Sequence, residues 1–309
     1  MLKLYEDRRI GGSPRLYLAE ERDDLMLVPE EIKKCVVFLC YRAGAQIMLA
    51  GTGFFLAAPS SIAGKVYIYL VTARHVVEAI QQRGTDGHVL VRLNSIDGGA
   101  TLISSVAESW RFHPSDSRAD VAAIQWTPDR GKFDYRAIPT SMLVTGDIEN
   151  EHSIGPGDEV FFPGLFVNHY GQKRNLPIIR VGNIAAMAEE PVSTKAYGEI
   201  DAYLVEARSI GGLSGSPVFV NLRPGRGGIF EAGAPGFYLM GLMHGHYESP
   251  LTDEDMLLED EEHMERVNMG IAIVVPTGKI RDVIDQDEFV GERHVADDVE
   301  RQRSAAVPD

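Results

Sequence analysis

The sequence predicts an all-β fold, either a sandwich or a barrel. From Cys35 onward, short apolar runs rich in Val, Ile, Phe and Tyr alternate with Gly, Pro, Asn and Asp, which is typical of many strands joined by turns. Segments with a 3.6-residue apolar period are few and short, at residues 74–82 and 277–285. The expected strands are 36–41, 53–57, 66–71, 88–92, 121–126, 159–162, 203–205, 217–220, 237–243 and 271–275.

The length of 309 residues allows roughly two compact units. A strand-poor stretch at residues 142–157 separates two strand-rich halves, and the insert at 253–265 contains eight Asp or Glu and no Lys or Arg. We interpret that insert as a solvated loop, with a partner-binding role as the alternative. The expected segments are an N-terminal extension (1–32), a first β-unit (33–145), a second β-unit (146–285) that includes a glycine-rich loop (221–236), and a polar tail (286–309) predicted to be disordered.

Charge and composition exclude several classes of function. The formal net charge is -15 and the pI is near 5.1, so we expect no nucleic-acid partner, because phosphate binding needs a basic face. Cys35 and Cys40 lie five residues apart in a predicted strand and therefore face opposite sides and should not pair. With no disulfide, no signal-peptide pattern and no apolar run near the roughly 20 residues of a membrane span, we expect a cytoplasmic protein without membrane contact.

Ser214 is the candidate nucleophile. It lies in the segment Gly-Gly-Leu-Ser-Gly-Ser-Pro at residues 211–217. Small neighbours allow a tight turn that exposes a hydroxyl and directs backbone N–H groups at a substrate oxygen. The alternative interpretation is a Gly/Ser turn that only precedes the strand at 217–220.

A serine nucleophile needs a base, and the base needs an orienting acid. His75 is the candidate base, because a buried-type strand runs into a short helical segment at this residue. Asp120 is the candidate acid, because it directly precedes an apolar strand, and Asp116 in the preceding loop is its competitor. The structural alternatives are a histidine at a strand end and an aspartate at a strand start.

Taken together, these segments resemble the trypsin-like serine peptidases of the chymotrypsin fold. The T-A-x-H histidine motif is matched at residues 71–76, the D-[IV]-A-x-[IL] motif at 120–124 and the G-x-S-G-[GS]-P motif at 212–217. Their order and separations also fit, whereas an α/β-hydrolase would place the serine first. Further matches lie at residues 51–55, 157–160 and 270–273, and the resemblance covers about residues 33–285.

The resemblance implies two six-stranded antiparallel β-barrels with the triad between them and a short C-terminal helix. It implies a serine endopeptidase that cleaves proteins or peptides through an acyl-enzyme, with no metal and no cofactor. The oxyanion would be held by the N–H groups of Gly212 and Ser214. The residues it implies for substrate binding are Arg208, Ser209, His244 and Gly245.

Arg208 and a histidine beside the specificity pocket would favour an acidic residue before the scissile bond by charge. The alternative is that Arg208 points to solvent or pairs with Glu206, and that the histidine only packs.

Leu213 departs from the family pattern. Secreted trypsins carry an Asp at this position, and that Asp pairs with a new N-terminus after activation cleavage. We therefore interpret Arg-Ile-Gly-Gly at residues 9–12 as a coincidental match to such a cleavage site and expect control by a regulatory protein partner. The alternative function is a latent or inactive peptidase-fold module that binds proteins, and an esterase that shares the chemistry is a third possibility.

Overall fold

The structure is a computed structural model, and it describes residues 4–5, 17–18, 28–207, 212–222, 236–248 and 268–305. The chain divides into two compact units, Met1–Glu30 and Glu31–Asp309. In the first unit, β1 (Leu4–Tyr5) pairs antiparallel with β2 (Tyr17–Leu18). The acidic insert at 253–265 and most of the glycine-rich loop lie outside the described residues.

The first strand-rich half forms an eight-stranded sheet in the order β7-β6-β3-β4-β5-β9-β8, with β10 paired to β4 in parallel. The interior strand β5 has the sequence Val-Tyr-Ile-Tyr-Leu-Val-Thr, and every position after the first is buried, as expected for a strand covered on both faces. The strands are β3 (Val36–Ala43), β4 (Gln46–Pro59), β5 (Val66–Thr72), β6 (His88–Asn94), β7 (Ala100–Val106), β8 (Arg111–Phe112), β9 (Ala122–Gln125) and β10 (Ile138–Pro139).

This sheet is not closed, so the expectation of a six-stranded first barrel is wrong for the described chain. The two ends of the sheet are β7 and β8, and no described ladder joins them. The physical reason is that β8 has only two residues and offers too few backbone groups for a second ladder. β7 pairs only with β6 among the described strands and has no buried position.

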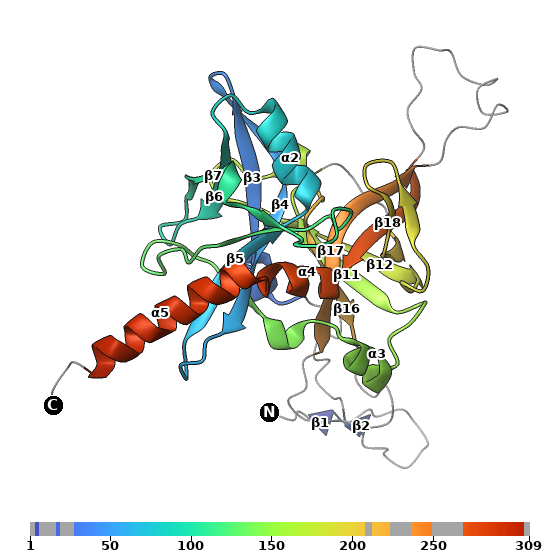
Figure 1. Cartoon of the computed structure of the whole chain (residues 1–309). Coiled ribbons are helices and arrows are strands. Elements are labelled where there is room, and N and C mark those ends of the chain that lie inside the picture. The colour runs from blue at the N-terminus through green and yellow to red at the C-terminus, as the bar shows by residue number, and fades with distance from the viewer. Residues whose placement is uncertain are drawn as a thin grey trace, which may run out of the picture. The chain divides into compact units, whose positions relative to one another are not determined.

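The second strand-rich half is a closed six-stranded barrel, as the resemblance implies (Figure 1). Its strands pair in the cyclic order β11-β12-β15-β18-β17-β16, and every described pairing is antiparallel. Buried Val160, Phe162, Val205, Val218 and Val274 belong to its apolar core. The strands are β11 (Glu159–Gly164), β12 (Ile178–Ala186), β15 (Tyr203–Glu206), β16 (Pro217–Asn221), β17 (Phe237–Glu248) and β18 (Asn268–Pro276), and β13 (Val192–Thr194) pairs with β14 (Gly198–Ile200) in a separate hairpin.

Two helices lie where the apolar period predicts them. These are α2 (Arg74–Arg83) and α4 (Thr277–Ile284). The strand-poor stretch contains a helix that the sequence pattern did not predict, α3 (Gly146–His152), which Thr145 caps by accepting a hydrogen bond from the N–H of Ile148. The remaining helical elements are α1 (Glu30–Lys33), the 3₁₀ turns η1 (Ala107–Ser109), η2 (Thr140–Met142) and η3 (Val167–His169), and α5 (Asp287–Ala305). None of the described helices is long and apolar enough to cross a membrane.

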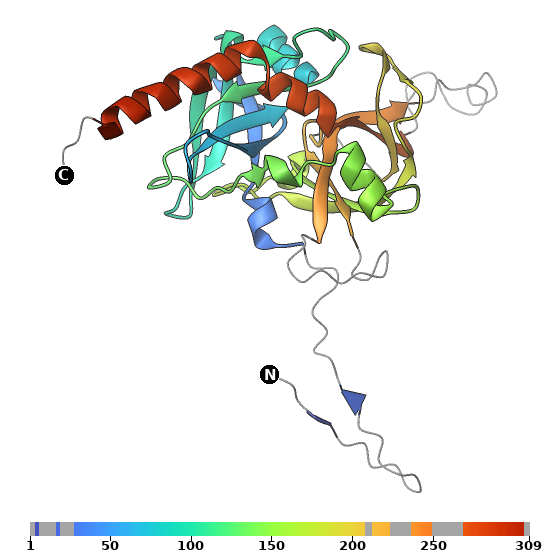
Figure 2. The same ribbon diagram turned by 60° about the horizontal axis from the view of Figure 1, so that its bottom comes forward.

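The predicted polar tail is helical over α5, so the expectation of disorder is wrong for residues 287–305. Asp297 on this helix is buried and accepts hydrogen bonds from the hydroxyls of Ser60, Ser61 and Tyr67 near the start of β5. Figures 1 and 2 show α5 beside β5, with its last turns extending past the sheet. These tertiary contacts hold a segment that its polar composition would leave unfolded.

Candidate active site

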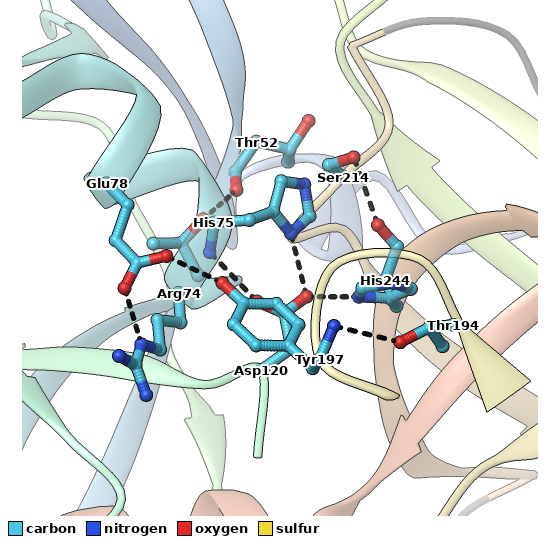
Figure 3. Close-up of polar contacts among 10 residues, drawn as sticks. Thr52, Arg74, His75, Glu78, Asp120, Thr194, Tyr197, Ser214 and His244 are labelled. Atoms are coloured by element: carbon cyan, nitrogen blue, oxygen red, sulfur yellow. Dashed lines mark hydrogen bonds and ion pairs between the residues drawn. The ribbon is translucent and has the colours of Figure 1, made fainter. Parts of the chain in front are cut away.

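Asp120 and His75 come together at the start of α2. Asp120 is fully buried, and its Oδ1 accepts a hydrogen bond of 2.8 Å from the backbone N–H of His75. Its Oδ2 lies 2.8 Å from Nδ1 of the His75 ring (Figure 3). Because His75 is the second residue of α2, Asp120 satisfies an N–H that has no partner inside the helix, and the helix dipole favours its negative charge. One carboxylate therefore fixes both the backbone and the ring of the candidate base.

The charges of this pair favour ionised Asp120. Burial opposes ionisation, but the charge of His75 and the hydrogen bonds from His244 and His75 outweigh it and hold the pKa of Asp120 well below its usual range. Burial of the His75 ring opposes its protonation, yet the neighbouring Asp120 charge and hydrogen bond raise the pKa of His75 above its ordinary value. Asp116, the competing acid, does not contact His75: it forms ion pairs with Lys279 and Arg118.

Ser214 lies in a turn that fits tightly against the strands leading to His75. Gly215 has a φ of +81°, and a Cβ there would lie 2.2 Å from the Thr52 carbonyl oxygen and 2.3 Å from Oγ1 of Thr72. The Ser214 carbonyl accepts a 2.9 Å hydrogen bond from the N–H of Thr52, and the Gly215 N–H donates to the Met243 carbonyl at 2.8 Å. Only glycine allows this approach, so Gly215 brings the serine turn to the end of β5, directly before α2.

The Ser214 hydroxyl donates to the backbone carbonyl of His244 at 3.2 Å. Among the described residues, no hydrogen bond joins this hydroxyl to His75. The structure thus joins His75 to Asp120 directly, and connects Ser214 to Asp120 through His244, whose backbone contacts the serine and whose ring contacts the carboxylate.

Thr52 supports the candidate oxyanion turn, and no sequence motif indicated this role. Its Oγ1 donates to the Gly212 carbonyl at 2.9 Å and accepts from the N–H of Leu165 at 2.8 Å. Leu213 is buried in the core of the second barrel, where it anchors the turn by packing. Neither the Gly212 N–H nor the Ser214 N–H donates to a described backbone carbonyl, which is the condition for binding an oxyanion.

A further group of side chains lies around Asp120 and His244. Nδ1 of His244 lies 2.5 Å from Oδ2 of Asp120. Tyr197 lies in the turn between β13 and β14, and the centroid of its ring is 6.1 Å from that of the His244 ring. Its hydroxyl donates a hydrogen bond of 2.8 Å to Glu78. Glu78 accepts from Arg74 one helical turn earlier on α2. The i,i+4 spacing of Arg74 and Glu78 is a sequence signal for this pair, but no local signal identifies Tyr197.

The structure describes two of the four predicted substrate-binding residues, His244 and Gly245. Arg208 and Ser209 lie outside the described residues. Nδ1 of the His244 ring is hydrogen-bonded to Asp120, and the backbone carbonyl of His244 accepts from the Ser214 hydroxyl. Gly245 pairs with Ile273 on β18, and a Cβ on it would meet open space. Substrate binding by these four positions stays a prediction.

The donor atoms of His75, Asp120 and His244 all lie within 4.8 Å of one another, and these are residue types that bind zinc. Both ring Nδ1 atoms are, however, hydrogen-bonded to the same oxygen of Asp120. A metal ion on these atoms would have to replace both bonds. The arrangement fits acid–base chemistry, because an ionised carboxylate can accept one ring N–H from each imidazole.

No family model and no curated protein matches this chain. Among solved structures, the chain is similar to the MamO protease domain from Magnetospirillum magneticum in its apo form, at 16% identity over 81% of this chain and 96% of that one, with a TM-score of 0.49. It is also similar to the HtrA-type protease AlgW with a decapeptide (14% identity, 82% and 66% coverage, TM-score 0.47) and to the Rv3671c protease from M. tuberculosis in its active form (16%, 82% and 80%, TM-score 0.44).

Proposed function

We propose that this protein is a serine endopeptidase that uses Ser214, His75 and Asp120. The observation that carries the proposal is the pair of hydrogen bonds that Asp120 accepts from the backbone N–H and the ring of His75. Since a carboxylate only accepts, His75 Nδ1 must carry the proton, and its Nε2 is left as the basic nitrogen. This is the tautomer that a serine nucleophile requires.

The reaction we propose is acyl transfer. Nε2 of His75 takes the proton of Ser214 as its Oγ attacks the scissile carbonyl, and the N–H groups of Gly212 and Ser214 bind the oxyanion. His75 then donates the proton to the leaving amine and activates water to hydrolyse the acyl-enzyme. In the free protein the Ser214 hydroxyl donates to the His244 carbonyl, so the reacting state needs a rotation about the Cα–Cβ bond of Ser214. Catalytic hydrogen bonds are often unformed before substrate binds.

We assign proteins or peptides as substrates and the cytoplasm as location. An acidic residue before the scissile bond is the specificity hypothesis, and it rests on the charge of Arg208. A peptide library tests it, since cleavage mainly after Lys, Arg or large apolar residues would contradict it.

A fluorophosphonate probe tests the nucleophile. We expect covalent labelling of the wild type and of Ser104→Ala, whose side chain is exposed on β7, and none of Ser214→Ala. Labelling of Ser214→Ala at the wild-type rate would refute the assignment. An active serine that cleaves small esters but no peptide in the library would indicate the esterase.

The second candidate is a peptidase-fold module that binds proteins and is latent or inactive until a regulatory partner engages it. Two observations favour it: Leu213 is buried and offers no acid for activation by a new N-terminus, and the Ser214 hydroxyl does not contact His75 among the described residues. Labelling that needs added cell extract would support latency. Absence of labelling with and without extract would favour a pure binding module.

A further inference from the structure

Two imidazoles share one carboxylate oxygen in this site. Oδ2 of Asp120 is 2.8 Å from Nδ1 of His75 and 2.5 Å from Nδ1 of His244. Because ionised Asp120 only accepts hydrogen bonds, both neutral rings must carry their proton on Nδ1. The two rings meet edge to face with their centroids 5.3 Å apart (Figure 3). His244 is thus placed to donate a hydrogen bond to the same carboxylate that orients His75.

The His244 ring borders a cleft that is open to solvent. Its side chain is 11% exposed and lines a cavity of about 400 Å³ between the β13–β14 hairpin and β17. The titratable or charged groups around the ring are Asp120, His75 and Glu78 from the side of α2, Tyr197 from the hairpin, and Lys195, His246 and Tyr247 in the cleft.

We propose that His244 is a positioning residue for Asp120 and that its protonation lowers the reactivity of the site. Neutral His244 donates a hydrogen bond that holds the carboxylate in place. Protonated His244 neutralises the charge of Asp120, so the carboxylate can no longer stabilise the imidazolium that His75 becomes in the transition state. This inference rests on the proposed function and adds to it a dependence of activity on a second histidine.

The substitutions His244→Asn and His244→Ala separate the two parts of the proposal. An Asn amide can place an N–H donor near the position of Nδ1 but does not become charged at neutral or mildly acidic pH. At pH 8 we expect fluorophosphonate labelling of His244→Asn within about threefold of wild type. We expect His244→Ala to label at least about tenfold more slowly, because it leaves a buried carboxylate lone pair unsatisfied. The control is His88→Asn, a partly exposed histidine at the start of β6.

The labelling rate is measured as a function of pH. The number of ionisations on the acidic side of this profile would not change if His244 had a purely structural role. Wild type and His88→Asn should show two ionisations, and His244→Asn only one. If the wild type and His244→Asn both show one ionisation at the same pH, the inference is wrong while the proposed nucleophile stands.

Histidine NMR tests the inference without turnover. Wild type and His88→Asn should give two strongly downfield Nδ1–H resonances, with coupled titrations of His75 and His244. His244→Asn should give one such resonance and a shifted His75 titration. If nothing labels at any pH, the proposed function fails, but these spectra still decide the inference. An unchanged His75 titration in His244→Asn overturns it.

Discussion

Gly215→Ala is the substitution whose effect follows most directly from the structure. At a φ of +81° an L-residue is strained, which costs roughly 1–2 kcal/mol. The new Cβ would lie 2.2 Å from the Thr52 carbonyl oxygen, 2.3 Å from Thr72 Oγ1 and 3.0 Å from the Ala73 backbone nitrogen. Overpacking of this kind costs typically about 1–3 kcal/mol. We therefore expect Gly215→Ala to lower the free energy of unfolding by about 2–5 kcal/mol.

The turn can relieve the contact only by moving Ser214 away from the end of β5. A displacement of about 1 Å costs on the order of a hundredfold in rate, so labelling by the fluorophosphonate should fall by that much in the fraction that remains folded. Gly146→Ala is the matched control: Gly146 begins α3, and a Cβ on it meets no atom within 4 Å. Its free energy of unfolding should lie within about 0.5 kcal/mol of wild type.

Urea unfolding followed by circular dichroism measures the stability, and a labelling time course measures the site. If Gly215→Ala unfolds at the same urea concentration as Gly146→Ala and labels at the wild-type rate, the tight approach of the serine turn to β4 and β5 is wrong.

Four further predictions concern Asp120, the pH dependence of labelling, the anchoring of α5 and the dependence of labelling on metal ions. Asp120→Asn should slow labelling by about 10⁴-fold, because an amide facing Nδ1 favours the wrong tautomer of His75; a loss below tenfold would contradict the assigned acid. Since the pKa of His75 is raised and the base must be neutral, the single ionisation expected in the acid limb of His244→Asn should have its midpoint above the ordinary histidine value of about 6.5, and a midpoint below that value would contradict the pairing of His75 with Asp120. Asp297→Ala should lower the urea midpoint, whereas exposed Asp298→Ala should not, and equal midpoints would mean that α5 is not anchored through Asp297. Dialysis against EDTA should leave the labelling rate unchanged. A fall in the labelling rate that added zinc reverses would mean that His75, Asp120 and His244 bind a metal ion.

The sequence located the strands whose apolar runs are continuous. The strand 66–71 and the helix 74–82 were predicted nearly to the residue, because burial on both faces and an amphipathic period are local patterns. β7 was missed because its apolar residues are interrupted by Thr101, Ser104 and Ser105 and form no continuous apolar run. Open or closed pairing of the first sheet depends on which strands meet at its ends, and local patterns do not contain that information.

For the site, the sequence by itself determined His75, Asp120 and Ser214 as candidates. The three short motifs contain the residue types that a serine nucleophile, its base and its orienting acid require, and they follow the order of the family that they resemble. The structure places His75 and Asp120 in contact. Only the tertiary structure decided that His244 contacts Asp120 with its ring. His244 is 124 residues from Asp120 along the chain, and its ring lies against Asp120, His75 and Tyr197, which come from three other parts of the chain. Tertiary contacts likewise decided that the polar tail is a helix, because the partners of Asp297 lie more than 200 residues away.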